Sequence, residues 1–385
     1  MIPSPQSLAT VLGTALAALA AGYTTLAAIA LRRPANPGRL LARQPGREAM
    51  PAVTILKPLC GAEQGLYERL RSFCEQRYPD FQIVFGVRDP GDPALTAVRQ
   101  LQRDFPGLDL EVAANPSQHG TNAKVSNLIN MMPHAHHDYL VIADSDVRVP
   151  CDYLERVIAP LADEGVGIVT CPYRGAPRPG LWSLLGSMFV NEWFMPSVRV
   201  AALLGSREFA FGATIALRRE SLERIGGFAA LANRLADDYA LGELTRQRGL
   251  TTVLSGLEVE TSVDEAGAGG LLRHELRWLR TIRAVRPVGY ALSGITFGLP
   301  VAILGTALAR GMALAVALLA VTAAARVMID SAPRRSCSPW MQLWVIPLAD
   351  LLAFALWCWS FATREVEWRH TRYRVARDGT AQPLP

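Results

Sequence analysis

The first thirty residues of the chain lack charge: none occurs between Ile2 and Leu31. The stretch from Val11 to Leu31 is dominated by Leu and Ala, and it is long enough to cross a bilayer core about 30 Å thick. No basic region precedes it, which argues against a secretory signal peptide. A buried helix of a soluble protein is the weaker interpretation because the apolar run is so long. We predict a transmembrane anchor over residues 1–33.

Two further patterns are missing from the chain. Its six cysteines (60, 74, 151, 171, 337 and 358) form no C-x-x-C pair, which argues against a zinc site or disulfide framework and for a reducing compartment. The net charge is +5, but no Lys/Arg run interleaved with aromatic residues occurs in the middle of the chain. We therefore assign the basicity to a membrane surface and expect no nucleic-acid partner.

Apolar segments return near the C-terminus, at roughly Val288–Ala309, Met312–Ile329 and Met341–Phe361. Each is near spanning length, but the first is interrupted by Gly and Pro and is predicted to be broken or re-entrant. Arg residues after the N-terminal anchor place the following domain in the cytoplasm. Three full crossings would put the basic tail outside, so we expect one segment, the first, not to span. This predicts membrane segments over 287–362 and a basic cytoplasmic tail over 363–385.

Between these apolar ends, strands alternate with helices. The linker-like stretch Arg32–Met50 is rich in Arg, Pro and Gly. Short apolar runs after it predict strands at Val53–Leu56, Gln82–Val87, Leu108–Ala113 and Val166–Thr170. Amphipathic runs predict helices at Gln64–Gln76, Ala94–Phe105, Lys124–Met132 and Tyr153–Leu161. The alternation predicts an α/β domain over 50–286 with a mostly parallel sheet covered on both faces.

Two carboxylates end the most apolar of these strands. Val141-Ile142-Ala143 leads directly into Asp144-Ser145-Asp146. Ligands of parallel sheets bind outside the carboxyl ends of the strands, and paired carboxylates there suit a hard divalent cation that also meets substrate phosphates. The alternative is a turn that caps the next helix, a role that Asp152 could fill without either acid. We favour the metal–phosphate interpretation.

Other polar groups allow two interpretations. Leu181–Leu204 is apolar but interrupted by charge, so it is either a pair of interfacial helices or ordinary core. Leu271–Arg286 is basic and amphipathic, as membrane-surface helices are. Asp237 and Asp238 open a helix, where the helix dipole alone favours acids. His134, His136 and His137 are close in sequence but lack supporting partners, so a solvated loop is the preferred interpretation.

Five short motifs occur in a fixed order: Lys57-Pro58-Leu59-x-Gly61, Asp89, Asp144-x-Asp146, Asp238-Tyr239 and Arg277-Trp278. With them, the chain resembles the ceramide glucosyltransferase-like family of inverting, membrane-bound glycosyltransferases of the GT-A type. The resemblance runs from about Thr54 to the C-terminus. Within the family, the stretch from Asn122 to Leu128 most resembles the bacterial hopanoid-biosynthesis branch.

The resemblance implies roles for the donor site. Asp89 would contact the uracil or ribose of a UDP-sugar, and Lys57 and Lys124 would assist at the nucleotide or its phosphates. Asp144 and Asp146 would hold Mg²⁺ or Mn²⁺ against the diphosphate, where a cation neutralises the charge of the departing UDP.

It also implies roles on the acceptor side. Asp238 would be the general base that takes the proton of the acceptor hydroxyl, with Asp237 beside it as an acceptor or product contact. Arg277 would meet the diphosphate and Trp278 would wall the acceptor pocket. His274 stands where the family has Gln or Arg, so its contact is left open.

The leading hypothesis is therefore transfer of N-acetylglucosamine from UDP to a lipid alcohol, bacteriohopanetetrol, at the cytoplasmic face of a bacterial inner membrane. Transfer of glucose to ceramide is the alternative, although Met195-Pro196 stands where sphingolipid-type members tend to carry His-Pro. A membrane transporter or scaffold that only binds nucleotide is a third hypothesis. Few intramembrane charges, chiefly Asp350, would serve a transport path.

Overall fold

The computed structural model describes residues 5–33, 50–208, 210–331, 339–363, 365–368, 371–376 and 379–383. Residues 34–49 of the predicted linker Arg32–Met50 and parts of the predicted tail lie outside these residues. The chain forms two compact units, which we call the helical unit and the sheet unit. The helical unit comprises Met1–Pro34, Pro177–Gly205 and Val263–Asp378, and the sheet unit comprises Ala35–Ala176, Ser206–Ser262 and Gly379–Pro385.

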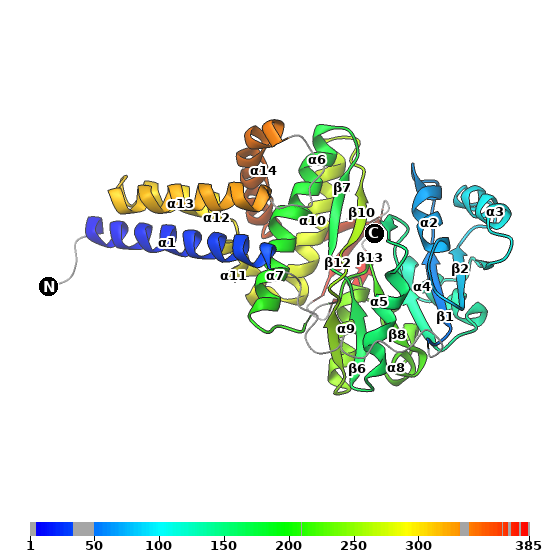
Figure 1. Ribbon diagram of the computed structural model, residues 1–385. Helices are drawn as coiled ribbons and strands as arrows, with labels where there is room; N and C mark the ends of the chain where they lie inside the picture. Colours follow the sequence, from blue (N-terminus) through cyan, green and yellow to red (C-terminus); the bar gives the residue numbers. More distant parts are fainter. Residues whose placement is uncertain are drawn as a thin grey trace. The chain divides into compact units, whose positions relative to one another are not determined.

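The sheet unit is built on a seven-stranded sheet with the order β3-β2-β1-β4-β8-β6-β9 (Figure 1). The four strands on one side, β3 to β4, are parallel, β6 and β9 are parallel to each other, and only β8 runs antiparallel to its neighbours. The strands are β1 (Val53–Pro58), β2 (Phe81–Val87), β3 (Asp109–Ala114), β4 (Tyr139–Ile142), β6 (Val166–Thr170), β8 (Ile215–Arg218) and β9 (Thr251–Leu254). The prediction of a mostly parallel sheet is confirmed.

Helices follow the strands as the alternation predicts. Their bounds are α2 (Leu66–Cys74), α3 (Ala94–Asp104), α4 (Ala123–Met131), α5 (Tyr153–Ile158), α8 (Arg219–Arg224) and α9 (Asp237–Gln247), with 3₁₀ turns at Met132–His134, Ala159–Ala162 and Phe228–Leu231. A small second sheet orders β5 (Val147–Arg148), β10 (Val259–Val263) and β7 (Tyr173–Pro177). Asp144-Ser145-Asp146, which we call the acidic turn, directly precedes β5. The pairing of β5 with β10 therefore brings a distant segment to that turn.

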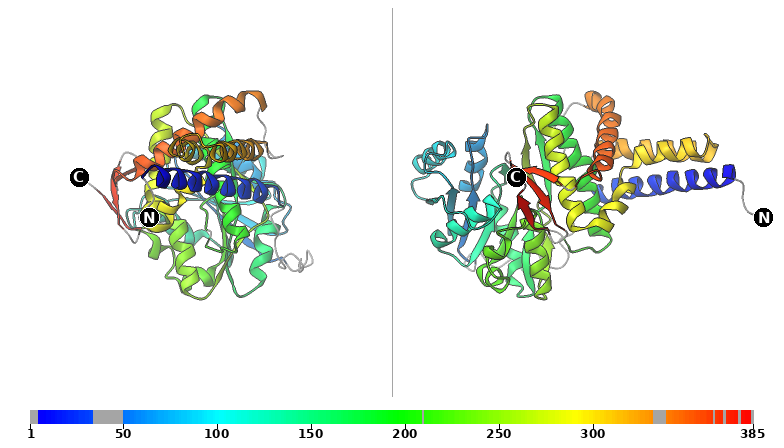
Figure 2. Two further views of the ribbon diagram at one scale, coloured as in Figure 1. Left: turned by 90° about the vertical axis from the view of Figure 1, so that its left-hand side faces the viewer. Right: turned by 180° about the vertical axis from the view of Figure 1, so that it is seen from behind.

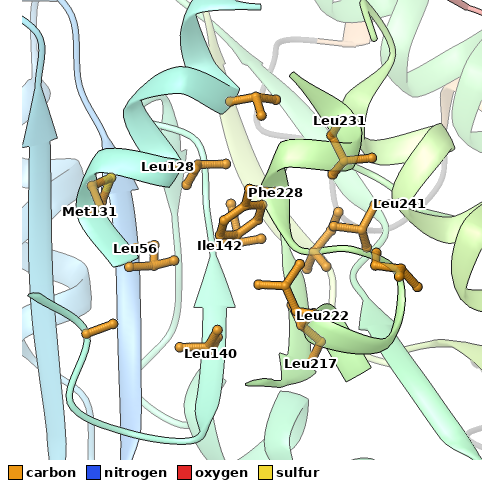
Figure 3. Packing of buried hydrophobic residues seen from close by; sticks show 14 of the residues in the cluster. Leu56, Leu128, Met131, Leu140, Ile142, Leu217, Leu222, Phe228, Leu231 and Leu241 are labelled. Carbon is orange, nitrogen blue, oxygen red and sulfur yellow. The ribbon is translucent and has the colours of Figure 1, made fainter. Parts of the chain in front are cut away.

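One hydrophobic cluster fixes two helix N-termini over the same part of the sheet. Figure 3 shows Leu128 and Met131 of α4 facing Leu56 of β1, with Leu241 of α9 on the other side of the cluster. Complete burial of a Leu or Met side chain contributes about 1.5–3 kcal/mol. The cluster therefore fixes the positions of α4 and α9, whose first turns carry Lys124 and the pair Asp237-Asp238.

The helical unit contains the apolar segments. Within the described residues, Gln6–Arg32 of α1 (Pro5–Arg32) and Ala313–Asp330, which is α13, are long and apolar enough to cross a membrane. The two helices lie side by side in the two side views (Figures 1 and 2). The first C-terminal segment forms α11 (Pro287–Leu292), a 3₁₀ turn (Ser293–Thr296) and α12 (Gly298–Leu308), with a bend of 73° at the break. The bend fits a broken span or a re-entrant loop, so the number of crossings stays a prediction.

The segments expected at the membrane interface also lie in the helical unit. They form α6 (Leu181–Met188), a π-helical turn (Phe189–Phe194), α7 (Met195–Leu203) and α10 (Ala268–Val285). Helices α6 and α10 pack with α14 (Pro339–Ser360), whereas α7 packs with α1. In the same unit β11 (Glu365–Trp368) pairs antiparallel with β12 (Thr371–Val375). Their predicted membership of the catalytic domain stays a prediction, because a compact unit is not the same as a functional domain. At the end of the chain, β13 (Ala381–Pro383) belongs to the sheet unit.

Helices α1 and α12 approach so closely that only glycine fits at their crossing. A Cβ atom at Gly305 would lie 2.6 Å from the Gly13 carbonyl oxygen and 2.8 Å from the Ala17 nitrogen. We expect G305L to separate the helices and to lower the free energy of unfolding in detergent by about 1–3 kcal/mol, as overpacking does. The matched control is G22L on α1, because a Cβ at Gly22 meets nothing within 4 Å. Equal losses of stability for the two variants would contradict this account of the crossing.

Candidate active site

The acidic turn is held in place by a buried lysine of β1. Lys57 on β1 has no exposed surface, and its Nζ donates a hydrogen bond to the backbone oxygen of Asp144 at 2.5 Å. Burial lowers the pKa of Lys57 to about 7, although Asp144 and Asp146 oppose the shift. In this structure Lys57 therefore positions the acidic turn, and its predicted contact with the nucleotide remains a prediction.

A second basic side chain supports the middle of the turn. Arg69 on α2 donates from Nε to the Ser145 backbone oxygen at 3.2 Å and from Nη2 to Glu63 at 2.9 Å. The Ser145 hydroxyl contacts the other oxygen of Glu63 at 3.4 Å. Sequence reasoning missed Arg69 and Glu63, because nothing local marks them as supports of a turn some 80 residues later. With both carbonyl oxygens bound, the turn is held where its carboxylates remain partly exposed.

Asp146 is held by the small second sheet. The Thr261 hydroxyl on β10 donates to Asp146 Oδ2 at 2.6 Å, and the backbone nitrogen of Ser262 donates to the Asp146 backbone oxygen at 3.0 Å. Burial, followed by the neighbouring Asp144, raises the pKa of Asp146 above its ordinary value. A carboxylate in this position is stabilised by an added cation, because the cation offsets both causes of the shift.

Lys124 links the acidic turn to the helix that carries the other acids. Its Nζ lies 2.5 Å from Asp144 Oδ1 and 3.7 Å from Asp237 Oδ2. Burial alone would lower the pKa of Lys124, but the carboxylates of Asp144 and Asp237 outweigh it, so the pKa lies above its ordinary value. Lysine occurs in this sequence only at positions 57 and 124, and both side chains contact Asp144.

The loop before α4 fixes Lys124 and Asp237 together. Asn122 caps α4, with its Oδ1 accepting a hydrogen bond from the Val125 backbone nitrogen at 3.1 Å. The Nδ2 of the same side chain donates to the Arg234 backbone oxygen at 2.8 Å and lies 3.4 Å from Asp237 Oδ1. Residues near the C-terminus hold the segment before α9, because the Leu235 nitrogen donates to the Gly379 oxygen and the Ala381 nitrogen donates to the Asn233 oxygen.

Asp238 faces the same space as Asp144, and Gly212 keeps that space open. Asp238 Oδ2 accepts a hydrogen bond from the Gly212 backbone nitrogen at 3.0 Å. A Cβ atom at Gly212 would lie 3.1 Å from Asp144 Oδ2, 3.3 Å from Lys124 Nζ and 3.7 Å from Asp238 Oδ2. Burial, then the charge of Asp237, raises the pKa of Asp238 to about 6. Sequence reasoning did not single out Gly212.

A polar pocket lies at the same edge of the sheet. Its polar lining includes Arg88 after β2, Asn115 after β3, and Ser126, Asn127 and Asn130 of α4. The buried Asn127 Oδ1 finds no hydrogen-bond partner among the described residues. Asp89, next to Arg88, is exposed at the end of β2 and accepts a hydrogen bond from the Gly91 nitrogen. Its predicted nucleoside contact is not tested, but the strand end places it beside this pocket.

Three of the predicted site residues, His274, Arg277 and Trp278, lie on α10 in the helical unit. His274 Nδ1 lies 2.8 Å from Glu265 Oε1, and its ring lies edge-on to Trp278 with the ring centres 6.1 Å apart. Trp278 also packs against Phe194, with the two ring centres 5.4 Å apart. The structure thus joins His274 and Trp278 on one helix with Arg277. Their predicted contacts with diphosphate and acceptor stay predictions.

The histidines and Asp152, for which the sequence left alternatives, make the following contacts. His134 and His136 lie beside acids of β3, with His134 Nδ1 against Glu111 and His136 Nδ1 3.4 Å from Asp109. Asp152 occupies the N-cap position of α5, but its side chain makes no capping hydrogen bond. Both imidazole side chains remain partly exposed. The side chains of Asp144 and Asp146 contact Lys124 and Thr261, respectively.

The acids of the turn fit a cation that the substrate helps to hold. Among the described residues no group of three or more His, Cys, Asp or Glu is arranged to hold a metal alone. Asp144 and Asp146 supply two partly exposed carboxylates. Mg²⁺ and Mn²⁺ sites in phosphate-handling proteins commonly combine one or two carboxylates with substrate phosphates and water. The donor set therefore fits a cation completed by a diphosphate.

The fold is similar to that of GT-A-type glycosyltransferases. A mannosyltransferase from Pyrobaculum calidifontis, solved in complex with GDP-Man and Mn²⁺, has a similar structure. It covers 92% of this chain and 97% of its own, with a TM-score of 0.51 and 21% sequence identity. At that identity the similarity concerns the fold alone. The predicted fold class is confirmed.

The sequence comparison gives the family. The model of glycosyl transferase family 21 matches residues 12–381, so the chain belongs to that family. Ceramide glucosyltransferase 3 of Caenorhabditis elegans is 24% identical over 62% of this chain and 52% of its own length. Ceramide glucosyltransferase of Candida albicans is 31% identical over 30% of this chain and 23% of its own. The chain thus matches about half or less of these relatives. The predicted family resemblance is confirmed, and its hopanoid branch stays a prediction.

The space at Gly212 gives a testable consequence. We expect G212A to push Asp144 and Lys124 apart and to weaken binding of Mn²⁺ together with a nucleoside diphosphate about tenfold. The free energy of unfolding should change by less than about 1 kcal/mol. Calorimetric titration measures the binding and a denaturant series measures the stability. The control is G107A, because a Cβ at Gly107 meets nothing within 4 Å. Unchanged binding in G212A would show that this space is not part of a ligand site.

Proposed function

We propose that this protein transfers a sugar from a nucleoside-diphosphate donor to a lipid alcohol, with inversion at the anomeric carbon. The observation that carries the proposal is the convergence of Asp144, Lys124 and Asp238 on the open space at Gly212. Membership of glycosyl transferase family 21 and the GT-A fold support glycosyl transfer as the reaction. The two helices of spanning character support a lipid as the acceptor.

The donor end is proposed to be a UDP-sugar held with Mg²⁺ or Mn²⁺. Asp144 and Asp146 would hold the cation, and Lys124 would exchange part of its contact with Asp144 for the diphosphate. The cation, when bound, neutralises the charge of the departing nucleotide. Arg88 and the amides of the polar pocket, with Asp89 beside them, would bind the nucleoside. The Mn²⁺ and GDP-Man of the Pyrobaculum mannosyltransferase support this arrangement of ligands.

Asp238 is proposed as the general base. A base works best when its pKa lies near the working pH, and burial beside Asp237 raises the pKa of Asp238 to about 6. Asp238 Oδ2, oriented by the Gly212 nitrogen, would take the proton of the acceptor hydroxyl as its oxygen attacks the anomeric carbon. A single displacement converts an α-linked donor into a β-glycoside. Asp237 keeps the pKa of Asp238 high and remains bound to Lys124.

For the acceptor, we propose the polyhydroxylated hopanoid bacteriohopanetetrol with N-acetylglucosamine as the sugar, at the cytoplasmic face of a bacterial inner membrane. The resemblance around Asn122–Leu128 supports this choice. Ceramide with glucose is the alternative, and the names of the matched relatives support it. Met195-Pro196 in place of His-Pro counts against ceramide.

The proposal is tested by mass spectrometry of lipids after the purified protein is incubated with UDP-N-acetylglucosamine or UDP-glucose and either a hopanoid polyol or ceramide. We expect one added sugar on the polyol. D238N should reduce turnover about 100- to 10,000-fold, as loss of a general base does, while UDP affinity stays within about threefold. Full activity of D238N, or no glycolipid from any pairing, would contradict the proposal, and the first result is what a transporter or scaffold predicts.

The pH dependence follows from the base. The unprotonated form of Asp238 is the active one and its pKa is raised to about 6, so kcat/KM should fall about tenfold per pH unit below 6 and level off above it. D237N removes the repulsion that helps raise this pKa, so the limb should move to lower pH in that variant. If the acidic limb of the kcat/KM profile stays at the same pH in D237N, the limb does not report the pKa of Asp238.

A further inference from the structure

The chain leaves the sheet unit after Ser262 and returns to it at Gly379. Backbone hydrogen bonds fix the return, because the Leu235 nitrogen donates to the Gly379 oxygen and the Ala381 nitrogen donates to the Asn233 oxygen. Open sheet edges do not occur within the hydrocarbon region of a bilayer, so the sheet unit lies wholly on one side of it. The segment between the two points must therefore cross the membrane an even number of times.

Helices α12 and α13 form a hairpin against α1, and both ends of this hairpin lie toward the Arg32 end of α1. At the start of α12, a Cβ atom on Gly298 would collide with Thr24 Oγ1. At the end of α13, the Ser331 hydroxyl accepts a hydrogen bond from Arg32 at 3.4 Å. The turn between the two helices lies further along α1, where the residues that flank it pack with Ala17. The hairpin thus enters a membrane from the side of Arg32 and returns to that side.

Helix α14 is the remaining candidate for a crossing among the described residues of this segment. Its 22 residues have a length of about 33 Å, which is enough to cross a bilayer core. The hairpin contributes an even number of crossings, so a crossing by α14 alone would make the total odd. Figures 1 and 2 also show α14 running across the direction of α1 and α13 and not along it. If α1 and α13 cross the bilayer, α14 therefore lies along its surface.

One face of α14 is exposed and apolar, with a tryptophan near each end. Its residues recur at helical spacing, and we call them the α14 stripe: Trp344, Leu348, Leu351, Cys358 and Trp359. Trp344 is 86% exposed, and the opposite face of the helix packs on α6 and α10. Contiguous apolar patches mark contact sites for a membrane or a protein, and tryptophan is enriched at membrane–water interfaces.

Two contacts place α14 near the depth at which α13 ends. Arg326, about 6 Å along α13 from its last residue, donates to Asp350 in the middle of α14 at 2.8–3.0 Å. The middle of a helix that crosses would instead lie about 15 Å from either surface of the core. Beyond α14, Arg283 of the basic helix α10 donates to the Thr363 backbone oxygen at 2.6 Å. Basic segments are attracted to anionic headgroups, so this contact also favours a place at the surface.

We propose that α14 lies in the bilayer interface on the side of Arg32, with the α14 stripe against the acyl chains, and that it does not cross the membrane. The partner of the stripe is the lipid surface. The sequence pattern assigned the non-crossing role to the first C-terminal segment, whereas here that segment enters the bilayer with α13. Both assignments keep the C-terminal tail in the cytoplasm. Sugar transfer is not required for this placement, so its test needs no turnover.

Matched positions on α14 and α13 distinguish an interfacial helix from a crossing one. Spin labels are attached to single cysteines of the full chain in nanodiscs of phosphatidylethanolamine and phosphatidylglycerol, with the other cysteines replaced by alanine. Power saturation with oxygen and with a Ni²⁺ chelate measures the depth of each label. Each set contains three exposed residues spaced seven apart on one helix face: W344C, L351C and the native Cys358 on α14, and L314C, V321C and M328C on α13.

We expect the three α14 labels to share one depth, about 5–10 Å into the boundary of headgroups and acyl chains. On α13 the label at position 321 should be deepest, with the other two about 10 Å shallower, because seven residues rise about 10.5 Å along a helix. The same profile on α14, with position 351 deepest, would overturn the proposal. Labels on α14 that are as accessible to the chelate as in water, or that show spin–spin broadening from a second copy of the chain, would also overturn it.

The crossing count has a test of its own that needs no replacement of cysteine. The chain carries an epitope tag after Pro385 and a protease site in the exposed turn at Gly107 of the sheet unit. When protease is added outside sealed vesicles, each molecule should lose the tag and be cut at the turn, or keep both intact. Molecules cut at only one of the two places would put the tail and the sheet unit on opposite sides, and α14 would then cross.

Discussion

The arrangement of the candidate site depends on one ammonium group among carboxylates. Asp144, Asp237 and Asp238 come from segments nearly a hundred residues apart, and without a cation their charges would repel one another in a partly buried space. Lys124 Nζ supplies that cation, at 2.5 Å from Asp144 and 3.7 Å from Asp237. The core beneath α4 and α9 keeps the helix ends at this distance, as Figure 3 shows for Leu128 and Leu241. Packing and charge therefore support each other here.

Much of the sheet unit was predictable because its signals are local. The apolar run before Asp144 and the amphipathic stretch over 124–132 match β4 and α4 closely. The antiparallel strand β8 and the pairing of β5 with β10 were not predicted, because pairing between distant short segments leaves no periodic mark in either one. A break in this segment was predicted from its Gly and Pro residues. The angle of 73° between α11 and α12 was not predicted, because it depends on packing in the helical unit.

The candidate site was likewise predictable only where its residues carry a local sequence signal. Acids at a strand end and at a helix start are marked by the local sequence pattern, so Asp144, Asp146 and Asp238 were named from the sequence. The groups that orient them were not, because Arg69, Thr261 and Gly212 act through contacts that only folding creates. Lys57 illustrates the difference: its motif suggested a phosphate contact, whereas its buried Nζ holds the Asp144 carbonyl oxygen. A motif thus marks the position of a residue more reliably than it marks what the side chain touches.

The central claim is that the acids around Lys124 form one donor site. It is tested most directly by a cryo-EM or crystal structure of the full chain with UDP and Mn²⁺. The account predicts the cation bound by Asp144, Asp146 and the diphosphate, the uracil in the pocket of Arg88 and Asn115, and Asp238 facing the space at Gly212. A nucleotide bound elsewhere, or a cation that none of these aspartates contacts, would contradict it.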